Sequence, residues 1–533
     1  MFYGILFVSG GAVLALELLA SRVLTPYFGV SLYIWTGILS ITLVALALGY
    51  WGGGRLAARR GATGNVARLT QLYALMPAIG AFAIVVACLV YPYLFPGLAT
   101  GDLVAGAFAA CLVLLFVPLV AASAMNPLLV AILLARGGGQ TGDAGTGTVL
   151  FVSTLGSVAG VLITAFGLIP YVSNFTALLV VALALAMLPL AAVARPPAPL
   201  MSRRRLAITA GGAAVASALL LWQADAYIGR MWPAGYGGRT WRVEARLGSL
   251  FGTVKILRSD PEADGRFRRI YFQDGLIQNT VGSDGRSLSF YTYALKALAR
   301  AYRPDLRSAL VLGLGAGIVP MQLAREGVAV EAVEIDPASL AAASRYFGFD
   351  GALVRVHLAD ARTHLKRCGR RYDVVVVDLF HGDGTPDYLL TRDFFRDLRG
   401  CLEPRGIAVF NTFADLEQPA VYAHLLATLR SELQHIVLYR PAWPGMTHVN
   451  SFIVAATIAL PEPRHVSLED VPPQFSGALD GMLGAPLALN RELLYRGEIV
   501  TDARSGAAHD IARNQLSYRR GVVGALPPAF LVN

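Results

Sequence analysis

The chain has 533 residues, a formal net charge of +10, 55% hydrophobic residues and only 15% charged residues. Its mean hydropathy of +0.55 excludes an ordinary soluble enzyme, because soluble domains carry about 25% charged residues. The apolar residues are concentrated before Arg239, and the composition from Arg239 onward is that of a soluble protein. We therefore expect a membrane domain followed by a water-soluble part.

The basic excess does not indicate nucleic-acid binding. Many arginines lie in short segments beside apolar stretches, including Arg55, Arg59, Arg60 and the cluster Arg203–Arg205. Membrane topology and anionic lipid account for arginines in such positions. The histidines and cysteines show no metal-site spacing, and the cysteines show no disulfide framework. The four cysteines are Cys88, Cys111, Cys368 and Cys401.

Seven apolar stretches are long enough to cross a bilayer as helices. They lie near residues 2–22, 32–53, 71–94, 102–121, 148–169, 174–194 and 206–223. The short segment Pro127–Leu134 adds an eighth crossing if residues 102–135 form a helical hairpin. With the first basic loop in the cytoplasm, seven crossings place the soluble part outside the cell and eight keep it inside. We favour eight crossings in a bacterial inner membrane, with a cytoplasmic soluble part, because an adenosyl donor is a cytoplasmic metabolite. The Arg203–Arg205 cluster argues against this choice.

Two ionisable residues lie in the first apolar stretch, Glu17 and Arg22. Charged groups at membrane depth are costly and usually face a protein interior or a wet cavity, so both are candidates for a site in the membrane domain. The alternative is structural, with Arg22 reaching the interface and Glu17 paired with it.

The soluble part alternates strand and helix patterns, which predicts a doubly wound, mainly parallel sheet. Two alternating segments precede it, Ser249–Leu257 and Arg268–Gln278, and predict a small β domain. The expected divisions are a membrane domain at 1–224, a linker and small β domain at 225–285, a Rossmann-like domain at 286–460 and a C-terminal extension at 461–533.

The segment Ser308–Asp336 predicts a nucleoside site. An apolar strand runs into three glycines at alternate positions and then a helix, and the next strand ends on acidic residues that can take the hydroxyls of a ribose. A dinucleotide fingerprint would need glycine where Ile318 stands. The spacing therefore favours an adenosyl ligand without a pyrophosphate over NAD.

Two further aspartates fall at predicted strand ends. Asp360 can accept a hydrogen bond from an adenine amino group, or it can cap the following helix. Asp378 ends a wholly apolar run and can hold an amine and accept its proton, or it can form a salt bridge. His381 and Asp383 follow in the next loop, where they can reach a substrate.

These residues resemble the spermidine synthase (polyamine aminopropyltransferase) family over about Ser249–Thr457. The shared features are a Gln-Asp-Gly turn, a later glutamine, the glycine loop, a Val-Glu-Ile-Asp segment, an Asp-Ala pair and a strand-end aspartate. They stand here at Gln273–Gly275, Gln278, Gly313–Gly317, Val333–Asp336, Asp360–Ala361 and Asp378. The whole chain is similar to the membrane-fused spermidine synthase-like proteins of bacteria, through Glu17, Arg22, Pro26 and Gly29, Ser153–Pro170, and Asp378–Phe395.

The resemblance implies a class I, S-adenosylmethionine-type transferase that moves a propylamine group from decarboxylated S-adenosylmethionine to an amine and releases methylthioadenosine. It assigns the catalytic role to Asp378. The expected substrate-binding residues are Gln278, Tyr291, His381, Asp383 and Trp443, and the donor-binding residues are Gln273, Gly313, Gly315, Gly317, Glu334, Asp336, Asp360 and Ala361. We expect the donor as cosubstrate, no resident cofactor or metal, a bilayer, an amine or lipid acceptor, no nucleic acid and a possible homodimer.

Several positions depart from the family pattern. Ala316 stands where the family has an aspartate that contacts the donor's amine, and His381 stands where a second aspartate helps to bind the diamine. A site with fewer carboxylates should bind a dicationic polyamine less well. The acceptor or the donor can therefore differ, and intact S-adenosylmethionine is one alternative. A methyltransferase on a membrane substrate and a metabolite transporter with a sensing domain are the other hypotheses.

Overall fold

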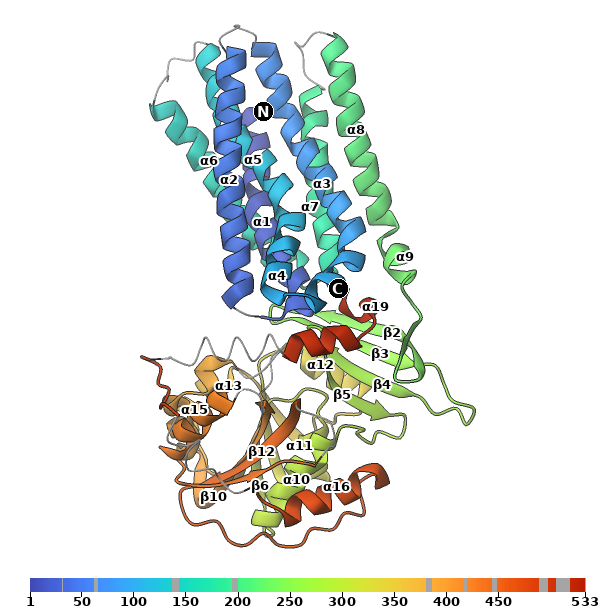
Figure 1. Ribbon diagram of the computed structural model, residues 1–533, viewed down its shortest axis with the longest axis vertical. Helices are drawn as coiled ribbons and strands as arrows, with labels where there is room; N and C mark the ends of the chain where they lie inside the picture. The colour runs from blue at the N-terminus through green and yellow to red at the C-terminus, as the bar shows by residue number, and fades with distance from the viewer. Residues whose placement is uncertain are drawn as a thin grey trace. The chain divides into compact units, whose positions relative to one another are not determined.

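A computed structural model describes residues 1–30, 32–61, 66–136, 143–193, 200–379, 386–415, 419–442, 448–487, 497–504 and 518–532 (Figure 1). The chain forms two compact units. The helical unit contains Met1–Gly238 and Arg520–Asn533, and the mixed unit contains Arg239–Arg519. The helical unit thus extends past the predicted boundary at residue 224 and takes in the last residues of the predicted C-terminal extension.

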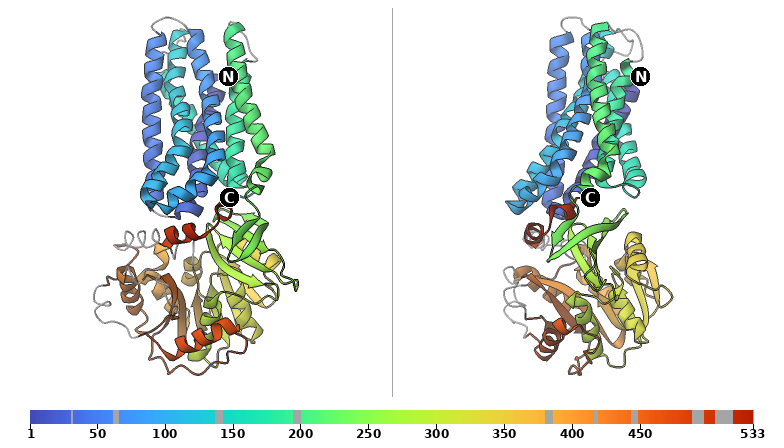
Figure 2. Two further views of the ribbon diagram at one scale, coloured as in Figure 1. Left: turned by 45° about the vertical axis from the view of Figure 1, so that its right-hand side comes forward. Right: turned by 90° about the vertical axis from the view of Figure 1, so that its right-hand side faces the viewer.

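Long apolar helices form the first unit (Figure 2). They are α1 Phe2–Phe28, α2 Leu32–Gly61, α3 Val66–Thr100, α4 Leu103–Cys111, α5 Val117–Ala135, α6 Asp143–Ile163, α7 Asn174–Val193, α8 Leu200–Trp222 and α9 Ala224–Gly229. The short strand β1 Ala234–Tyr236 and the helix α19 Pro528–Leu531 complete the unit.

Length and composition allow five helical spans to cross a membrane among the described residues. These are Phe2–Phe28, Tyr33–Arg59, Val66–Thr100, Leu103–Ala135 and Gly145–Leu168, with shorter apolar helices at Asn174–Leu190 and Leu206–Trp222. Large apolar side chains on these helices point outward, since Leu43, Phe82, Phe151, Ile163 and Phe166 are all more than half exposed.

The predicted hairpin in residues 102–135 is wrong. A π-helical segment, Leu112–Phe116, joins α4 directly to α5, so the chain is helical without a break from Leu103 to Ala135. Pro127 lies inside α5 and does not end it, because apolar helices tolerate proline where neighbouring groups satisfy the freed carbonyl. The eighth crossing is therefore absent from this part of the structure.

The helices α1 and α6 pack closely along glycines. Ser157 Oγ donates a hydrogen bond to the carbonyl oxygen of Gly10 at 2.9 Å. A side chain on Gly156 would collide with the backbone of Phe7, and one on Gly160 would collide with the backbone of Gly11. Small residues allow this approach of two backbones. Because residue numbers rise together along the two helices, α1 and α6 run parallel.

The mixed unit begins with an antiparallel sheet of β2 Arg239–Gly248, β3 Thr253–Ser259, β4 Arg268–Gln273 and β5 Leu276–Gly282. Three of these strands match the predicted β segments, and β2 lies ahead of them within the predicted region 225–285. Asp274 and Gly275 form the turn between β4 and β5, and both have positive φ angles, 48° and 91°. An Asp-Gly pair with this geometry is typical of a tight hairpin.

A seven-stranded sheet forms the centre of the mixed unit, in the order β11-β12-β10-β9-β6-β7-β8. The strands are β6 Ser308–Leu312, β7 Ala329–Glu334, β8 Val354–Leu358, β9 Tyr372–Val377, β10 Leu402–Asp415, β11 His435–Tyr439 and β12 His448–Ala456. The five strands from β10 to β8 are parallel, and β12 is antiparallel to both its neighbours. This is the predicted doubly wound, mainly parallel sheet.

Both faces of this sheet are buried by helices. Val374 and Val376 of β9 belong to one hydrophobic core and Val375 and Val377 to the other, as the alternation of side chains along a strand requires. This explains the wholly apolar run before Asp378. The helices of the unit are α10 Phe290–Tyr302, α11 Ile318–Arg325, α12 Pro337–Tyr346, α13 Ala361–Lys366, the 3-10 helix Asp387–Leu389, α14 Arg392–Gly400, α15 Pro419–Arg430 and α16 Pro473–Gly484.

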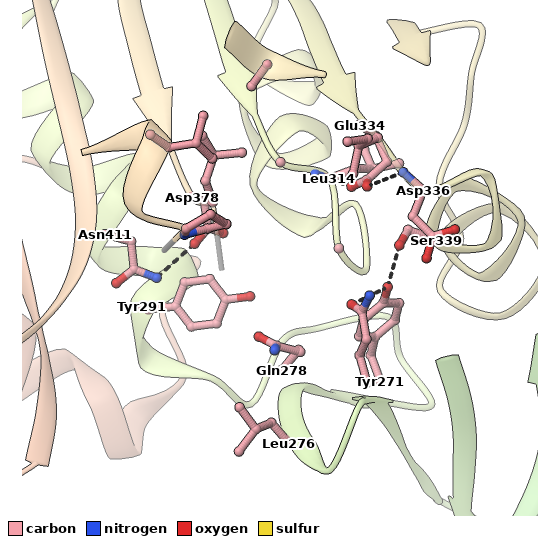
Figure 3. Close-up of a pocket in the computed structure, with 18 of the residues that line it drawn as sticks. Tyr271, Leu276, Gln278, Tyr291, Leu314, Glu334, Asp336, Ser339, Asp378 and Asn411 are labelled. Atoms are coloured by element: carbon pink, nitrogen blue, oxygen red, sulfur yellow. Dashed lines mark hydrogen bonds between the residues drawn. The ribbon is translucent and has the colours of Figure 1, made fainter. Parts of the chain in front are cut away.

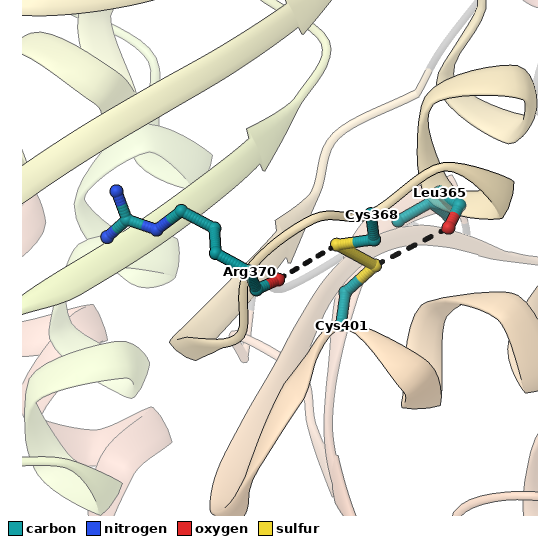
Figure 4. The surroundings of a disulfide bond; sticks show 4 residues. All are labelled: Leu365, Cys368, Arg370 and Cys401. Atoms are coloured by element: carbon teal, nitrogen blue, oxygen red, sulfur yellow. Dashed lines mark hydrogen bonds between the residues drawn. A yellow bond between two sulfur atoms is a disulfide. The ribbon is translucent and has the colours of Figure 1, made fainter.

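A disulfide joins Cys368, after α13, to Cys401, before β10 (Figure 4). The two Cα atoms are 5.9 Å apart, within the range that a disulfide spans. The spacing of the cysteines in the sequence did not predict this bond. Cys88 and Cys111 are buried free thiols in α3 and α4.

Candidate nucleoside-binding site

A cavity of about 640 Å³ opens at the carboxyl ends of the parallel strands in the mixed unit. Ligands bind at this edge in open α/β sheets. Its described lining contains four carboxylates and no lysine, arginine or histidine. The carboxylates are Glu334, Asp336, Asp360 and Asp378. Figure 3 shows Asp378 and Glu334 on opposite sides of the cavity, with Tyr291 beside Asp378.

The glycine loop after β6 forms one wall. Gly313 and Gly315 line the cavity, with φ angles of 93° and 52°. A side chain on Gly313 would also collide with the carbonyl oxygen of Asp378, because β6 and β9 are neighbours there. Gly317 begins α11 with φ 75° and packs on Phe349 instead. These positions require glycine for conformation and close approach.

Glu334, the last residue of β7, holds the glycine loop and the next turn together. Its Oε2 accepts from the backbone N–H of Leu314 at 3.0 Å, and its Oε1 accepts from the backbone N–H of Asp336 at 2.8 Å. Burial raises the pKa of Glu334, although these two donors oppose the shift. An ionised carboxylate accepts about four hydrogen bonds, so two backbone bonds leave capacity for the hydroxyls of a ribose.

Asp336 and Asp360 both cap helices at the edge of the cavity. Asp336 accepts from the backbone N–H of Ala338 at 2.8 Å and begins α12. Asp360 accepts from the backbone N–H of Thr363 at 2.8 Å and from the hydroxyl of Tyr388 at 3.1 Å. The structural role that the sequence offered for Asp360 is therefore present, together with its position in the lining.

The small β sheet contributes the wall that carries Gln273 and Gln278. The hydroxyl of Tyr271 donates to Gln273 Oε1 at 3.3 Å and lies 2.8 Å from Ser339 Oγ of α12. Asp274 accepts from the backbone N–H of Thr253 at 3.0 Å, which ties the hairpin turn to β3. These bonds fix the glutamine wall against the nucleotide fold.

Asp378 lies directly after β9 and is half-buried at the cavity. Its Oδ1 accepts from Asn411 Nδ2 at 2.8 Å, and Asn411 Oδ1 in turn accepts from Asn450 Nδ2 at 2.8 Å. Burial raises the pKa of Asp378 to about 6, and the bond from Asn411 partly opposes this shift. The group is thus a carboxylate near neutral pH that can accept a proton, which suits a general base.

Tyr291 of α10 lies beside Asp378 in the cavity (Figure 3). Asn279 Nδ2 donates to its hydroxyl oxygen at 3.2 Å. Burial and the charge of Asp378 both raise the pKa of Tyr291, so its hydroxyl stays protonated and remains a hydrogen-bond donor. A protonated hydroxyl beside a carboxylate can orient a polar group bound between them.

The structure brings most of the predicted site residues to one cavity. These are Gln273, Gln278, Tyr291, Gly313, Gly315, Glu334, Asp336, Asp360, Ala361 and Asp378. His381, Asp383 and Trp443 lie outside the described residues. Glu17 and Arg22 are half-buried on α1 in the helical unit and do not belong to this cavity.

Sequence reasoning missed Tyr271, Ser339, Tyr388, Asn411 and Asn450, which also line the cavity. Asn411 carried a signal, because it follows the apolar run Ile407–Phe410 and so falls at the same sheet edge as Asp378. Asn450 lies on the antiparallel strand β12 opposite Phe413, and no sequence pattern indicated it.

Comparison with known proteins finds relatives for the part of the chain that forms this cavity. Residues 288–451 match the spermine/spermidine synthase domain. The polyamine aminopropyltransferase of Vibrio vulnificus is 36% identical over 149 residues, covering 27% of this chain and 49% of that protein. That of Moorella thermoacetica is 29% identical over 200 residues, covering 35% of this chain and 67% of that protein.

The chain thus spans about half to two thirds of the length of these two relatives. A solved structure of a probable spermidine synthase from Corynebacterium glutamicum is similar to 50% of this chain, over 98% of its own, with 16% identity and a TM-score of 0.40. From the family match and the sequence relatives, the C-terminal half of this chain contains a spermine/spermidine synthase domain.

Proposed function

We propose that the cavity of the mixed unit binds decarboxylated S-adenosylmethionine and transfers its aminopropyl group to an amine. The observation that carries the proposal is Asp378, a half-buried carboxylate with a pKa of about 6 in the lining of a cavity that contains four carboxylates. The polyamine aminopropyltransferases that match this chain support the reaction class.

The charge of the lining suits such a donor. The donor is a cation, with a sulfonium and a free amine, and it would meet Glu334, Asp336, Asp360 and Asp378 with no described cationic side chain in the lining. A cleft of one sign of charge concentrates ligands of the opposite sign. In this proposal Glu334 takes the ribose, Asp360 lies near the adenine, and the glycine loop allows the backbone to approach the nucleoside.

The reaction is a displacement at carbon. The nitrogen lone pair of a neutral amine attacks the carbon next to the sulfonium, the carbon–sulfur bond breaks, and its electron pair stays on sulfur as methylthioadenosine. The new ammonium group transfers one proton to the carboxylate of Asp378. A sulfonium is a good leaving group, so the protein contributes mainly by orienting the reactants and by removing that proton.

The nucleoside product tests this proposal. Purified full-length protein is incubated with decarboxylated or intact S-adenosylmethionine and a panel of amines, and the products are identified by mass spectrometry. The proposal predicts methylthioadenosine and an aminopropylated amine in equal amounts, with neither formed by Asp378→Asn. Absence of methylthioadenosine with every donor and amine pair would refute it.

A methyltransferase is the second candidate, and two observations favour it. Ala316 is buried in an apolar cluster with Val254 and Ile256, so no carboxylate at this position selects the donor's amine. An N-terminal histidine N-methyltransferase of Emericella nidulans is 31% identical over 142 residues, covering 25% of this chain and 25% of that protein. Release of S-adenosylhomocysteine from intact donor, instead of methylthioadenosine, would select this candidate.

The proposal also places the helical unit in a cell membrane as a multi-pass domain. Its long apolar helices and outward-facing side chains such as Phe82 and Phe151 support this, because exposed apolar surface of this extent needs lipid or a partner. The acceptor is then an amine that reaches the site from water or from the bilayer. Resistance of the chain to alkaline carbonate extraction of membranes tests the embedding, and release into the soluble fraction contradicts it.

A further inference from the structure

Within residues 1–222, the arginines lie almost all at or beside one end of the helices, and Arg230 and Arg520 of the same unit lie outside this stretch. Nine of the ten arginines in residues 1–222 fall at the ends of α2, α5 and α7 or the starts of α3 and α8, including the connection from α7 to α8. We call this end the basic face. The nine are Arg55, Arg59, Arg60, Arg68, Arg136, Arg195, Arg203, Arg204 and Arg205, and the remaining one is Arg22 in α1.

The connections at the opposite end contain no arginine or lysine. They are residues 29–31 between α1 and α2, 101–102 between α3 and α4, and 169–173 after α6. Short loops rich in Lys and Arg stay in the cytoplasm. The basic face is therefore the cytoplasmic end of the unit.

The number of crossings then decides where the chain leaves the membrane. α1 and α6 run parallel, as the contacts of Ser157 with Gly10 and of Gly160 with Gly11 require. Parallel directions require an odd number of crossings between α1 and α6, which is met when α2, α3 and the continuous α4–α5 helix each cross once. α7 and α8 form a hairpin, so they add two crossings or none, and the total is odd in either case.

An odd number of crossings from a cytoplasmic start leaves Trp222, at the end of α8, on the far side of the membrane. The described residues from Arg239 to Arg519 contain no further membrane-length apolar helix, so the mixed unit stays on that side. This count argues against the cytoplasmic placement expected from the sequence, which required the eighth crossing.

The disulfide between Cys368 and Cys401 is an independent observation in the same direction. Cytoplasmic thiols are kept reduced, whereas disulfides form and persist in the periplasm and outside the cell. Cys401 is buried in a hydrophobic core, and the bond joins the end of α13 to the start of β10. The bond is therefore part of the packed nucleotide fold and favours an oxidising compartment for this domain.

We infer that the spermine/spermidine synthase domain of this protein faces the exoplasmic side of the membrane. The inference rests on the membrane embedding proposed above, the arginines, the helix directions and the disulfide, and it is independent of the proposed reaction. If both hold, a transport step must deliver the adenosyl sulfonium donor across the membrane before this enzyme acts, because that donor is made in the cytoplasm.

Labelling of single cysteines in intact cells tests the inference. In the full chain with Cys88→Ala, Cys111→Ala and Cys401→Ala, the half-buried Cys368 is the remaining thiol. A membrane-impermeant maleimide should label it in intact spheroplasts to the same extent as after lysis. The matched control replaces all four native cysteines by alanine and introduces Arg136→Cys at the basic face, and it should react only after lysis. The reverse pattern would overturn the inference.

The state of the native pair provides a second measurement that does not depend on a single-cysteine variant. The Cys88→Ala, Cys111→Ala protein is blocked with a permeant maleimide in cells, denatured, reduced and treated with a polyethylene glycol maleimide. Two added polymers per chain after reduction, and none without it, are expected. If Cys368 and Cys401 are both blocked before reduction in cells that oxidise periplasmic thiols, the domain lies in the cytoplasm.

Discussion

Replacing Asn411 by leucine tests the role of Asp378 as the proton acceptor. Asn411 donates to Asp378 at 2.8 Å and so favours the ionised carboxylate, and leucine has a similar size but no donor. A hydrogen bond to a charged group is worth roughly 1.5–3 kcal/mol, and one pKa unit corresponds to about 1.4 kcal/mol. Loss of this bond should therefore raise the pKa of Asp378 by about 1 to 2 units.

The rate should follow this shift because only the ionised carboxylate accepts the proton. The acidic limb of kcat/KM is expected near pH 6 in the wild type and near pH 7 or above in the variant. For a shift of one unit, the ionised fraction at pH 6 falls from about a half to about a tenth, so the rate falls about fivefold there and little near pH 9.

The assay measures methylthioadenosine release between pH 5 and 9 and reports the ratio of variant to wild type, which cancels the titration of the amine itself. Thr412→Val is the matched control, because Thr412 is the next residue on β10 and bonds to Ser451 rather than to Asp378. A ratio for Asn411→Leu that stays constant across this range would refute the role given to Asp378.

Three further variants probe the site. Burial raises the pKa of Asp378 from 3.8 to about 6, so ionisation of this carboxyl lowers the free energy of unfolding as pH rises through that window. Asp378→Asn should therefore be more stable than wild type by about 3 kcal/mol at pH 8 and equally stable at pH 3. Equal shifts of the thermal unfolding midpoint at both pH values would contradict this. The free energy of unfolding of Gly313→Ala should be about 2 kcal/mol or more below that of Gly315→Ala, because the added methyl meets the carbonyl of Asp378 only at Gly313. Chemical unfolding of the two proteins measures this difference. Tyr388→Phe removes one bond to Asp360 and leaves its helix cap intact, so the KM for the donor should rise about fivefold with kcat unchanged, and an unchanged KM would remove Asp360 from the donor site.

The nucleotide fold was predictable because its signals are local. β6, the glycine loop and Glu334 follow one another within a short stretch, and a strand buried on both faces is a continuous apolar run. Strand ends of parallel sheets share one edge, so Asp360 and Asp378 could be placed beside the glycine loop before any contact was known. The same rule extends to Asn411, which sequence reasoning passed over because an amide does not titrate.

The features that the sequence did not predict depend on contacts between residues that are distant in the sequence. The segment Pro127–Leu134 suggested a second crossing, but the structure keeps Leu103–Ala135 continuous, since packing against α2 and α3 stabilises residues of poor helix propensity. Cys368 and Cys401 lie 33 residues apart and meet only because β9 and β10 are neighbours in the sheet. β2 was missed because its sequence, rich in arginine, has the character of a linker.

Binding of the nucleoside product tests the central claim most directly, because it needs neither the acceptor nor the side of the membrane. Full-length protein in lipid nanodiscs is titrated with methylthioadenosine by calorimetry, together with Glu334→Gln and Glu331→Gln. Glu331 lies on the same strand and bonds to His357 and Arg370, so its variant should bind as the wild type does. Glu334→Gln places an amide against the N–H groups of Leu314 and Asp336 and should bind at least about tenfold more weakly. Saturable binding by the wild type and Glu331→Gln, weakened in Glu334→Gln, is the expected result, and no measurable binding by the wild type would contradict a nucleoside site in this cavity.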